Sequence, residues 1–153
     1  MAPIPDLIPI NREVGHHTHY IGKYRTRKQF AAFVVASFPR DQIQNHTREE
    51  RLWYAVVHEF DKDGNHLQTR HSYLGSAADQ GADFTKRSMK ALAKLMEDLG
   101  QVRYANIKVK LFSVEIDGRL FGLVDDSDGD TTRVTLWPND LAFFPPWSGS
   151  YDT

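Results

Sequence analysis

Apolar residues occur in short runs along most of the chain, and polar tips rich in turn residues separate these runs. The run 29–38, QFAAFVVASF, is apolar at both alternating sets of positions. A strand that is apolar on both faces is covered on both sides, so this run predicts a central strand. The shorter run THYIGKY and the tip RTRK precede it, and together they predict a hairpin.

The same pattern occurs twice more further along the chain. The runs RLWYAVVHEF and HLQTRHSYLG flank DKDGN, where Asp63 and Gly64 suit the positive-φ positions of a tight turn. The runs NIKVKLFSVEI and RLFGLV flank Asp117 and Gly118 in the same way, and TTRVTLW predicts one more strand. These runs predict an antiparallel sheet of successive hairpins with at least six strands.

The segment SAADQGADFTKRSMKALAKLMEDLG has a helical period instead. Asp83 suits the N-cap of this helix, and Gly100 suits its C-terminal end. In the polar stretch PRDQIQNHTREER, Thr47 and Glu50 have the spacing of a capping box and predict one helical turn within a loop. The predicted buried face of the long helix carries Phe84, Ser88, Leu92, Leu95, Met96 and Leu99.

The two ends of the chain differ from its middle. Residues 1–15 carry three prolines and predict an extended N-terminal arm, which its isoleucines hold along the body of the domain. Residues 138–153 are rich in aromatic residues and proline and predict an irregular C-terminal tail. The fold class is therefore a single α+β domain over residues 1–153, with the one long helix packed on one face of the sheet.

Composition narrows the functional classes. A chain of 153 residues with 41% hydrophobic content suits one domain with its own core. The absence of cysteine excludes disulfides, thiolate zinc sites and cysteine nucleophiles, and it suits the cytoplasm. The net charge of −1 favours neither nucleic acid nor an anionic membrane as a partner. No apolar run approaches the roughly 20 residues that span a bilayer, and the N-terminus lacks a signal-peptide pattern.

The stretch GHHTHY is the main candidate for chemistry. On a strand, His17 and His19 point to one face, where they could share a metal ion with His58 or His71 of the second hairpin. No HExxH motif or cysteine supports this ligand set. We therefore interpret GHHTHY as the start of a strand whose histidines form hydrogen bonds, and we expect no cofactor. A histidine- or metal-dependent enzyme is the alternative.

No nucleophile elbow or phosphate-binding loop is present in the sequence, so we favour a non-enzymatic function. The leading hypothesis is a cytoplasmic module that binds another protein, for example an immunity-type inhibitor that covers the active site of a toxin. Aromatic side chains on a stiff backbone and an acidic loop suit such contacts. The expected contact residues are Trp147, Tyr151, Asp125, Asp126, Asp128 and Asp130.

Several stretches of the sequence also resemble those of a known family. IPINREVGHHTHYIGKY, YAVVHEFDKDGNH, LFGLV and FPPWSGSYDT resemble small bacterial proteins, mostly actinobacterial, described as formate hydrogenlyase regulatory protein-like. The resemblance covers almost the whole chain and implies a compact cytoplasmic bacterial protein. It also implies a second alternative, a regulatory accessory role in transcription, and it transfers no catalytic residue.

Overall fold

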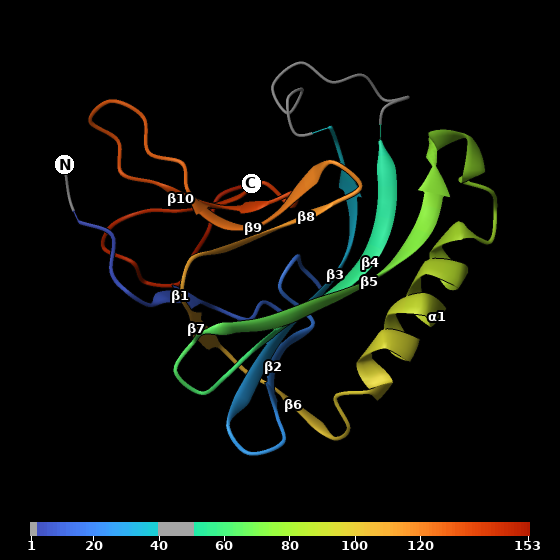
Figure 1. The fold of residues 1–153 in the computed structure, drawn as a ribbon, viewed down its shortest axis with the longest axis horizontal. Coiled ribbons are helices and arrows are strands. Elements are labelled where there is room, and N and C mark those ends of the chain that lie inside the picture. The colour runs from blue at the N-terminus through green and yellow to red at the C-terminus, as the bar shows by residue number, and fades with distance from the viewer. Residues whose placement is uncertain (1–2, 40–50) are drawn as a thin grey trace.

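The computed structural model describes residues 3–39 and 51–153 (Figure 1). Its largest sheet has five antiparallel strands in the order β5-β4-β3-β2-β6. These strands are β2 (Ile21–Tyr24), β3 (Lys28–Ser37), β4 (Leu52–Phe60), β5 (His66–Ser76) and β6 (Val102–Tyr104).

A four-stranded antiparallel sheet lies on one side of the large sheet, and the helix lies on the other side (Figure 1). The order in the smaller sheet is β11-β10-β9-β8, and a two-stranded sheet pairs β1 with β7. The remaining elements are β1 (Ile8–Ile10), the short 3-10 helix η3 (Ala77–Asp79), α1 (Phe84–Glu97), β7 (Ile107–Val109), β8 (Phe112–Ile116), β9 (Arg119–Asp125), β10 (Val134–Trp137) and β11 (Leu141–Phe143).

The two faces of β3 explain this layering. Ala31, Phe33 and Val35 belong to the core between the two large sheets. Phe30 and Ala32 belong to a second core, between the five-stranded sheet and α1. The predicted central strand is therefore confirmed, as is the α+β class with one long helix on one face of an antiparallel sheet.

The helix α1 follows its sequence pattern closely. Ser88 and Leu92 are buried, and Leu99 just beyond the helix is fully buried. The end at Gly100 is as predicted, with φ at +77° and a hydrogen bond from Gly100 N to Glu97 O. The N-terminal prediction is only half right, because Asp83 occupies the N-cap but its side chain makes no capping hydrogen bond. Within the described residues, no helix has the length and apolarity to cross a membrane.

The turns of the two later hairpins differ in detail. Asp117 and Gly118 both have positive φ, at +52° and +75°, as the tight turn between β8 and β9 requires. In the turn between β4 and β5 only Gly64 does, at +87°. A Cβ at Gly64 would meet the Leu7 side chain and the Lys108 backbone, so glycine also lets this turn pack against the N-terminal arm and β7.

The N-terminal arm lies along the body of the domain, as expected. Ile8 and Ile10 of β1 are buried in the core between the large sheets. Just beyond β1, Asn11 N donates a 3.0 Å hydrogen bond to Gly149 O. The Thr18 hydroxyl lies 3.2 Å from Tyr151 Oη. The segments near the two ends of the chain are thus held together.

Three features differ from the sequence-based predictions. The segment 138–153 is not wholly irregular, because β11 pairs with β10 and Ala142 forms a bridge with Asp152. The run NIKVKLFSVEI is divided between β7 and β8, which belong to different sheets. The single predicted sheet is accordingly divided into three. The helical turn predicted at Thr47 and Glu50 lies outside the described residues.

Candidate functional site

The most distinctive site is an unpaired edge of β3. This strand has ten residues, but β2 pairs only with the first four, from Lys28 to Ala31. The last contact is the 2.9 Å hydrogen bond from Ala32 N to Tyr20 O. No described strand pairs with residues 33–37 on this side, which we call the open edge of β3.

The backbone groups on the open edge follow from the antiparallel pattern. In such a ladder, alternate residues direct both their N–H and C=O groups to the same side of the strand. Ala32 donates toward β2, so the backbone groups of Val34 and Ala36 point the same way, into the open edge. Phe33 and Val35 direct their backbone groups toward β4. The backbone N–H and C=O groups of these two residues on the open edge therefore have no partner among residues 3–39 and 51–153.

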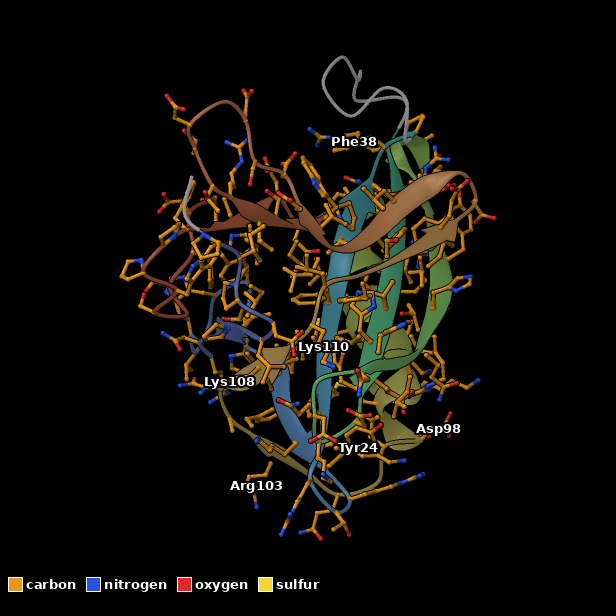
Figure 2. All side chains as sticks on the ribbon, turned by 60° about the vertical axis from the view of Figure 1, so that its left-hand side comes forward. Tyr24, Phe38, Asp98, Arg103, Lys108 and Lys110 are labelled. Atoms are coloured by element: carbon orange, nitrogen blue, oxygen red, sulfur yellow. The ribbon has the colours of Figure 1, made fainter. Side chains whose placement is uncertain are left out.

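The open edge forms the floor of a groove of about 670 Å³. The turn before β2 forms one side of the groove, and the turn between β10 and β11 contributes Pro138 and Asn139. Phe38 lies just past the end of β3 (Figure 2). The remaining lining side chains outside β3 are His16, His17, Tyr20, Arg51, Trp53, Met89 and Leu92.

Three buried polar atoms of the groove residues have no hydrogen-bond partner among the described residues. They are Arg51 Nε, Trp53 Nε1 and Asn139 Oδ1. An unsatisfied buried polar atom costs about 1–3 kcal/mol, so native structures contain few of them. The Arg51 guanidinium also lies over the Phe38 ring, 5.5 Å from its centroid. No acidic residue occurs among the described lining residues, so the groove suits a ligand that brings acceptors and negative charge.

GHHTHY borders this groove but does not form a strand. Residues 14–20 form turns, and β2 begins only at Ile21, so His17 and His19 do not share a strand face. The predicted hydrogen bonding is present at His19, where Nδ1 accepts a 2.7 Å bond from Gly15 N. The His17 ring contacts Tyr151 edge-on, with 6.2 Å between the centroids.

The other two candidate metal ligands lie in the five-stranded sheet. His58 is fully buried, with Nδ1 2.8 Å from Thr69 Oγ1, and burial lowers its pKa to about 3. His71 contacts the Tyr54 ring edge-on. In the part of the chain that the structure describes, no three His, Cys, Asp or Glu side chains are placed to hold a metal ion. The structure therefore does not bring His17, His19, His58 and His71 together.

Trp147 and Tyr151 are half-buried and pack against the core between the sheets. Tyr151 lies 5.9 Å from the Phe143 ring, centroid to centroid, in addition to its contact with Thr18. Trp147 has φ at +62°, and its N–H donates to Phe144 O. Both aromatic side chains thus have a structural role, and each leaves part of its surface accessible.

The acidic loop connects β9 to β10 and is mostly exposed. Hydrogen bonding from Ser127 lowers the pKa of Asp125. Asp126 accepts a 2.9 Å hydrogen bond from Thr135 Oγ1 and lies 3.8 Å from Arg133 Nε. Asp128 and Asp130 are exposed. Three of the four predicted contact carboxylates, those of Asp125, Asp128 and Asp130, are therefore exposed.

Sequence reasoning did not single out the open edge or its neighbours Arg51, Trp53 and Asn139. The sequence contains one signal of the open edge, because the apolar run QFAAFVVASF is longer than the apolar part of THYIGKY, the run before it. No protein-family model, curated protein or solved structure matches the chain. The resemblance to the regulatory protein-like family accordingly stays a prediction.

Proposed function

We propose that this chain is a cytoplasmic, non-enzymatic protein-binding module that takes up an extended segment of its partner as an added strand on the open edge of β3. The observation that supports the proposal is the set of backbone groups of Val34 and Ala36, which have no described partner and lie at the floor of a groove. Strand addition is an established mode of peptide recognition, in which main-chain hydrogen bonds supply affinity and side-chain pockets supply specificity.

The dimensions of the open edge favour a short segment. At about 3.3 Å per residue, the five residues 33–37 present an edge of roughly 17 Å, which suits a strand of four to six residues. Successive side chains of the added strand would point alternately toward α1 and toward the β10–β11 turn. Met89 and Leu92 line the first side and Pro138 the second, so apolar side chains fit both.

The buried polar atoms of the groove also restrict the chemistry of the segment that can bind there. Arg51 Nε and Trp53 Nε1 are buried donors without a described partner, at the end of the groove marked by Phe38. A carboxylate accepts from such donors more strongly than a neutral group does. The proposed occupant is therefore an extended apolar segment that carries a carboxylate at one end.

A toxin that an immunity-type protein neutralises is one partner that fits this proposal. The exposed carboxylates of Asp125, Asp128 and Asp130 support it, because a basic partner surface would be attracted to the β9–β10 loop. In such a complex the open edge would hold a strand of the toxin, and the loop would speed its association.

The test uses peptides and a substitution confined to the open edge. Eight-residue random peptides displayed on phage are selected on the whole protein, and the winning peptides are measured against Ala36→Pro. Proline removes the N–H that faces the groove and breaks none of the hydrogen bonds between β3 and β4. Ala36→Ser is the matched control, because it keeps the N–H and almost the same volume.

We expect apolar peptides with an acidic residue, at least tenfold weaker binding to Ala36→Pro, and unchanged binding to Ala36→Ser. Amide hydrogen exchange at Val34 and Ala36 should slow when the peptide binds, since their N–H groups become donors. Selection of no peptide, or of peptides that bind Ala36→Pro as well as the wild type, would overturn the proposal. Near-UV circular dichroism checks that Ala36→Pro is folded.

A further inference from the structure

Two cations face each other across neighbouring strands at another place in the five-stranded sheet. Lys23 of β2 is paired in register with Arg103 of β6. Side chains directly opposite in an antiparallel pair have Cβ atoms roughly 5 Å apart, and like charges in such positions are destabilising. No described carboxylate lies within ion-pair distance of either side chain. The fold alone gives no reason for this pair.

The pairing of these strands depends on a close backbone approach. A Cβ at Gly22 would overlap the carbonyl oxygen of Arg103, so only glycine permits β6 to lie where it does. Tyr24 and Val102 point into the core beneath α1, which leaves Lys23 and Arg103 on the opposite face. The two cations are therefore held together by the sheet itself.

The surroundings of Lys23 are also basic. It lines two adjoining cavities, of about 590 Å³ and about 430 Å³. Lys62, Lys108 and Trp147 line the larger one, and Arg25 and Arg103 line the smaller. No described lining residue of either cavity is acidic. Among the described residues, the lysines and arginines that line the two cavities form one ion pair, between Lys62 and Asp63 at 3.2 Å.

The charges of the molecule are thus separated in space. The acidic β9–β10 loop lies at the upper left of Figure 1, whereas the strands β2 and β6 lie at its lower edge. Arg103 and Lys108 lie on the same side of the molecule (Figure 2). The net charge of −1 therefore conceals a local positive field at the β2–β6 end of the sheet.

Three cations without an acidic residue among the described lining residues suit an anion with more than one negative charge, such as phosphate. Arginine binds phosphate through two parallel N–H bonds, and lysine binds it as a compact charge. The half-buried indole of Trp147, beside Lys108 in the larger cavity, offers a surface on which a planar ring can stack. We propose that this surface binds a phosphate ester with a planar base, its phosphate between Lys23, Arg103 and Lys108 and its base against Trp147.

The site is separate from the open edge of β3 and does not rest on the proposed function. A free nucleotide and a single-stranded oligonucleotide share the required chemistry. Calorimetric titrations at 50 mM salt with ADP, with a ten-residue single-stranded oligonucleotide and with inorganic pyrophosphate distinguish them. The variants are Lys23→Gln and Arg103→Gln, and the matched control is Lys90→Gln on the exposed side of α1.

We expect ADP or the oligonucleotide to bind, and each site variant to weaken that binding at least tenfold while Lys90→Gln changes it less than twofold. Tighter binding of the oligonucleotide would identify single-stranded nucleic acid as the source of the phosphate, and equal binding would identify a nucleotide. Equal binding of pyrophosphate and ADP would overturn the role of Trp147. No binding, or binding that survives both site variants, would overturn the whole proposal.

A second readout separates the proposed site from simple damage to the fold. Without ligand, Lys23→Gln and Arg103→Gln should melt at the same temperature as the wild type or higher, because each removes a like-charge repulsion. With ADP, or with the oligonucleotide if that is the tighter ligand, the wild type should gain thermal stability and the variants should not. A variant that melts lower without ligand would show that the pair stabilises the fold, contrary to the proposal.

Discussion

Tyr54 Oη donates a 2.6 Å hydrogen bond to Asp117 Oδ2, and this bond joins β4 of the five-stranded sheet to the turn between β8 and β9. Tyr54 is fully buried, and its ring also meets Phe121 of β9 edge-on. Burial and the bond to Asp117 raise the pKa of Tyr54, so its hydroxyl stays protonated and remains a donor. One side chain therefore holds the two large sheets together by both packing and hydrogen bonding.

Removal of this hydroxyl should weaken the contact between the sheets. We expect Tyr54→Phe to lower the free energy of unfolding by about 1.5–3 kcal/mol, the usual contribution of a hydrogen bond to a charged acceptor. Urea unfolding measures the change. Tyr73→Phe is the control, because Tyr73 is 54% exposed, and it should change stability by less than about 0.5 kcal/mol. Equal effects would show that the bond to Asp117 contributes nothing.

The buried His58 makes stability depend on pH. Its pKa is about 3 in the folded chain, whereas an unfolded histidine has a pKa of about 6.5. Between these values the unfolded chain binds a proton that the folded chain does not, so stability falls as the pH drops below about 6.5. The loss from this group between pH 7.5 and pH 5.0 should be about 2 kcal/mol.

The measurement for His58 is urea unfolding of the wild type and His58→Gln at those two pH values. The variant should be less stable at pH 7.5 but should lose less stability on acidification. His66 keeps part of the dependence, because burial lowers its pKa as well. The exposed His16→Gln should behave as the wild type does. The explanation fails if His58→Gln and the wild type show the same loss between the two pH values.

Gly22 should be intolerant of any side chain. The clash of a Cβ with the carbonyl oxygen of Arg103 would push β6 away from β2, so Gly22→Ala should cost about 2–3 kcal/mol in a chemical unfolding experiment. Gly81→Ala is the matched control, since a Cβ there meets only Asp83 Oδ1 at 3.7 Å. An equal loss of stability in Gly22→Ala and Gly81→Ala would mean that β6 can move away from β2 at little cost in free energy.

Trp147 should contribute to stability as well as to any contact surface. It packs on the core between the sheets, so Trp147→Ala should lower the free energy of unfolding by about 2 kcal/mol, less than a fully buried tryptophan would. Leu67→Ala, at a side chain 48% exposed, serves as the comparison and should have little effect. Unchanged stability in Trp147→Ala would indicate a purely displayed side chain.

Sequence patterns predict best those elements whose burial can be inferred from residues only a few positions apart. The two apolar faces of QFAAFVVASF indicated a covered strand, and the spacing from Phe84 to Leu99 indicated one helix face. The pairing of β1 with β7 and the division of strands among sheets depend on contacts between residues about 100 positions apart. A strand shows the same alternation of polar and apolar residues in either sheet, so this pattern does not indicate to which sheet the strand belongs.

The candidate site was less predictable for a related reason. The open edge exists because the chain turns away at residues 14–20, and apolar and aromatic residues such as Tyr20 occur in turns as well as in strands. Arg51 and Trp53 come near Asn139 only when the start of β4 meets the turn between β10 and β11. The acidic loop, by contrast, is recognisable because its four carboxylates lie within six consecutive positions, separated only by Ser127 and Gly129.

The hydrogen bond between Asn11 and Gly149 bears on when the chain can fold during its synthesis. The N-terminal arm is synthesised well before β7 and residues 148–149, which bind it. The growing chain therefore leaves the apolar side chains of the arm without these partners until those segments have been made. Contacts of such long sequence separation also make folding slow. Ile8 and Ile10 should consequently need protection from aggregation, for example by a chaperone, until β7 has been made.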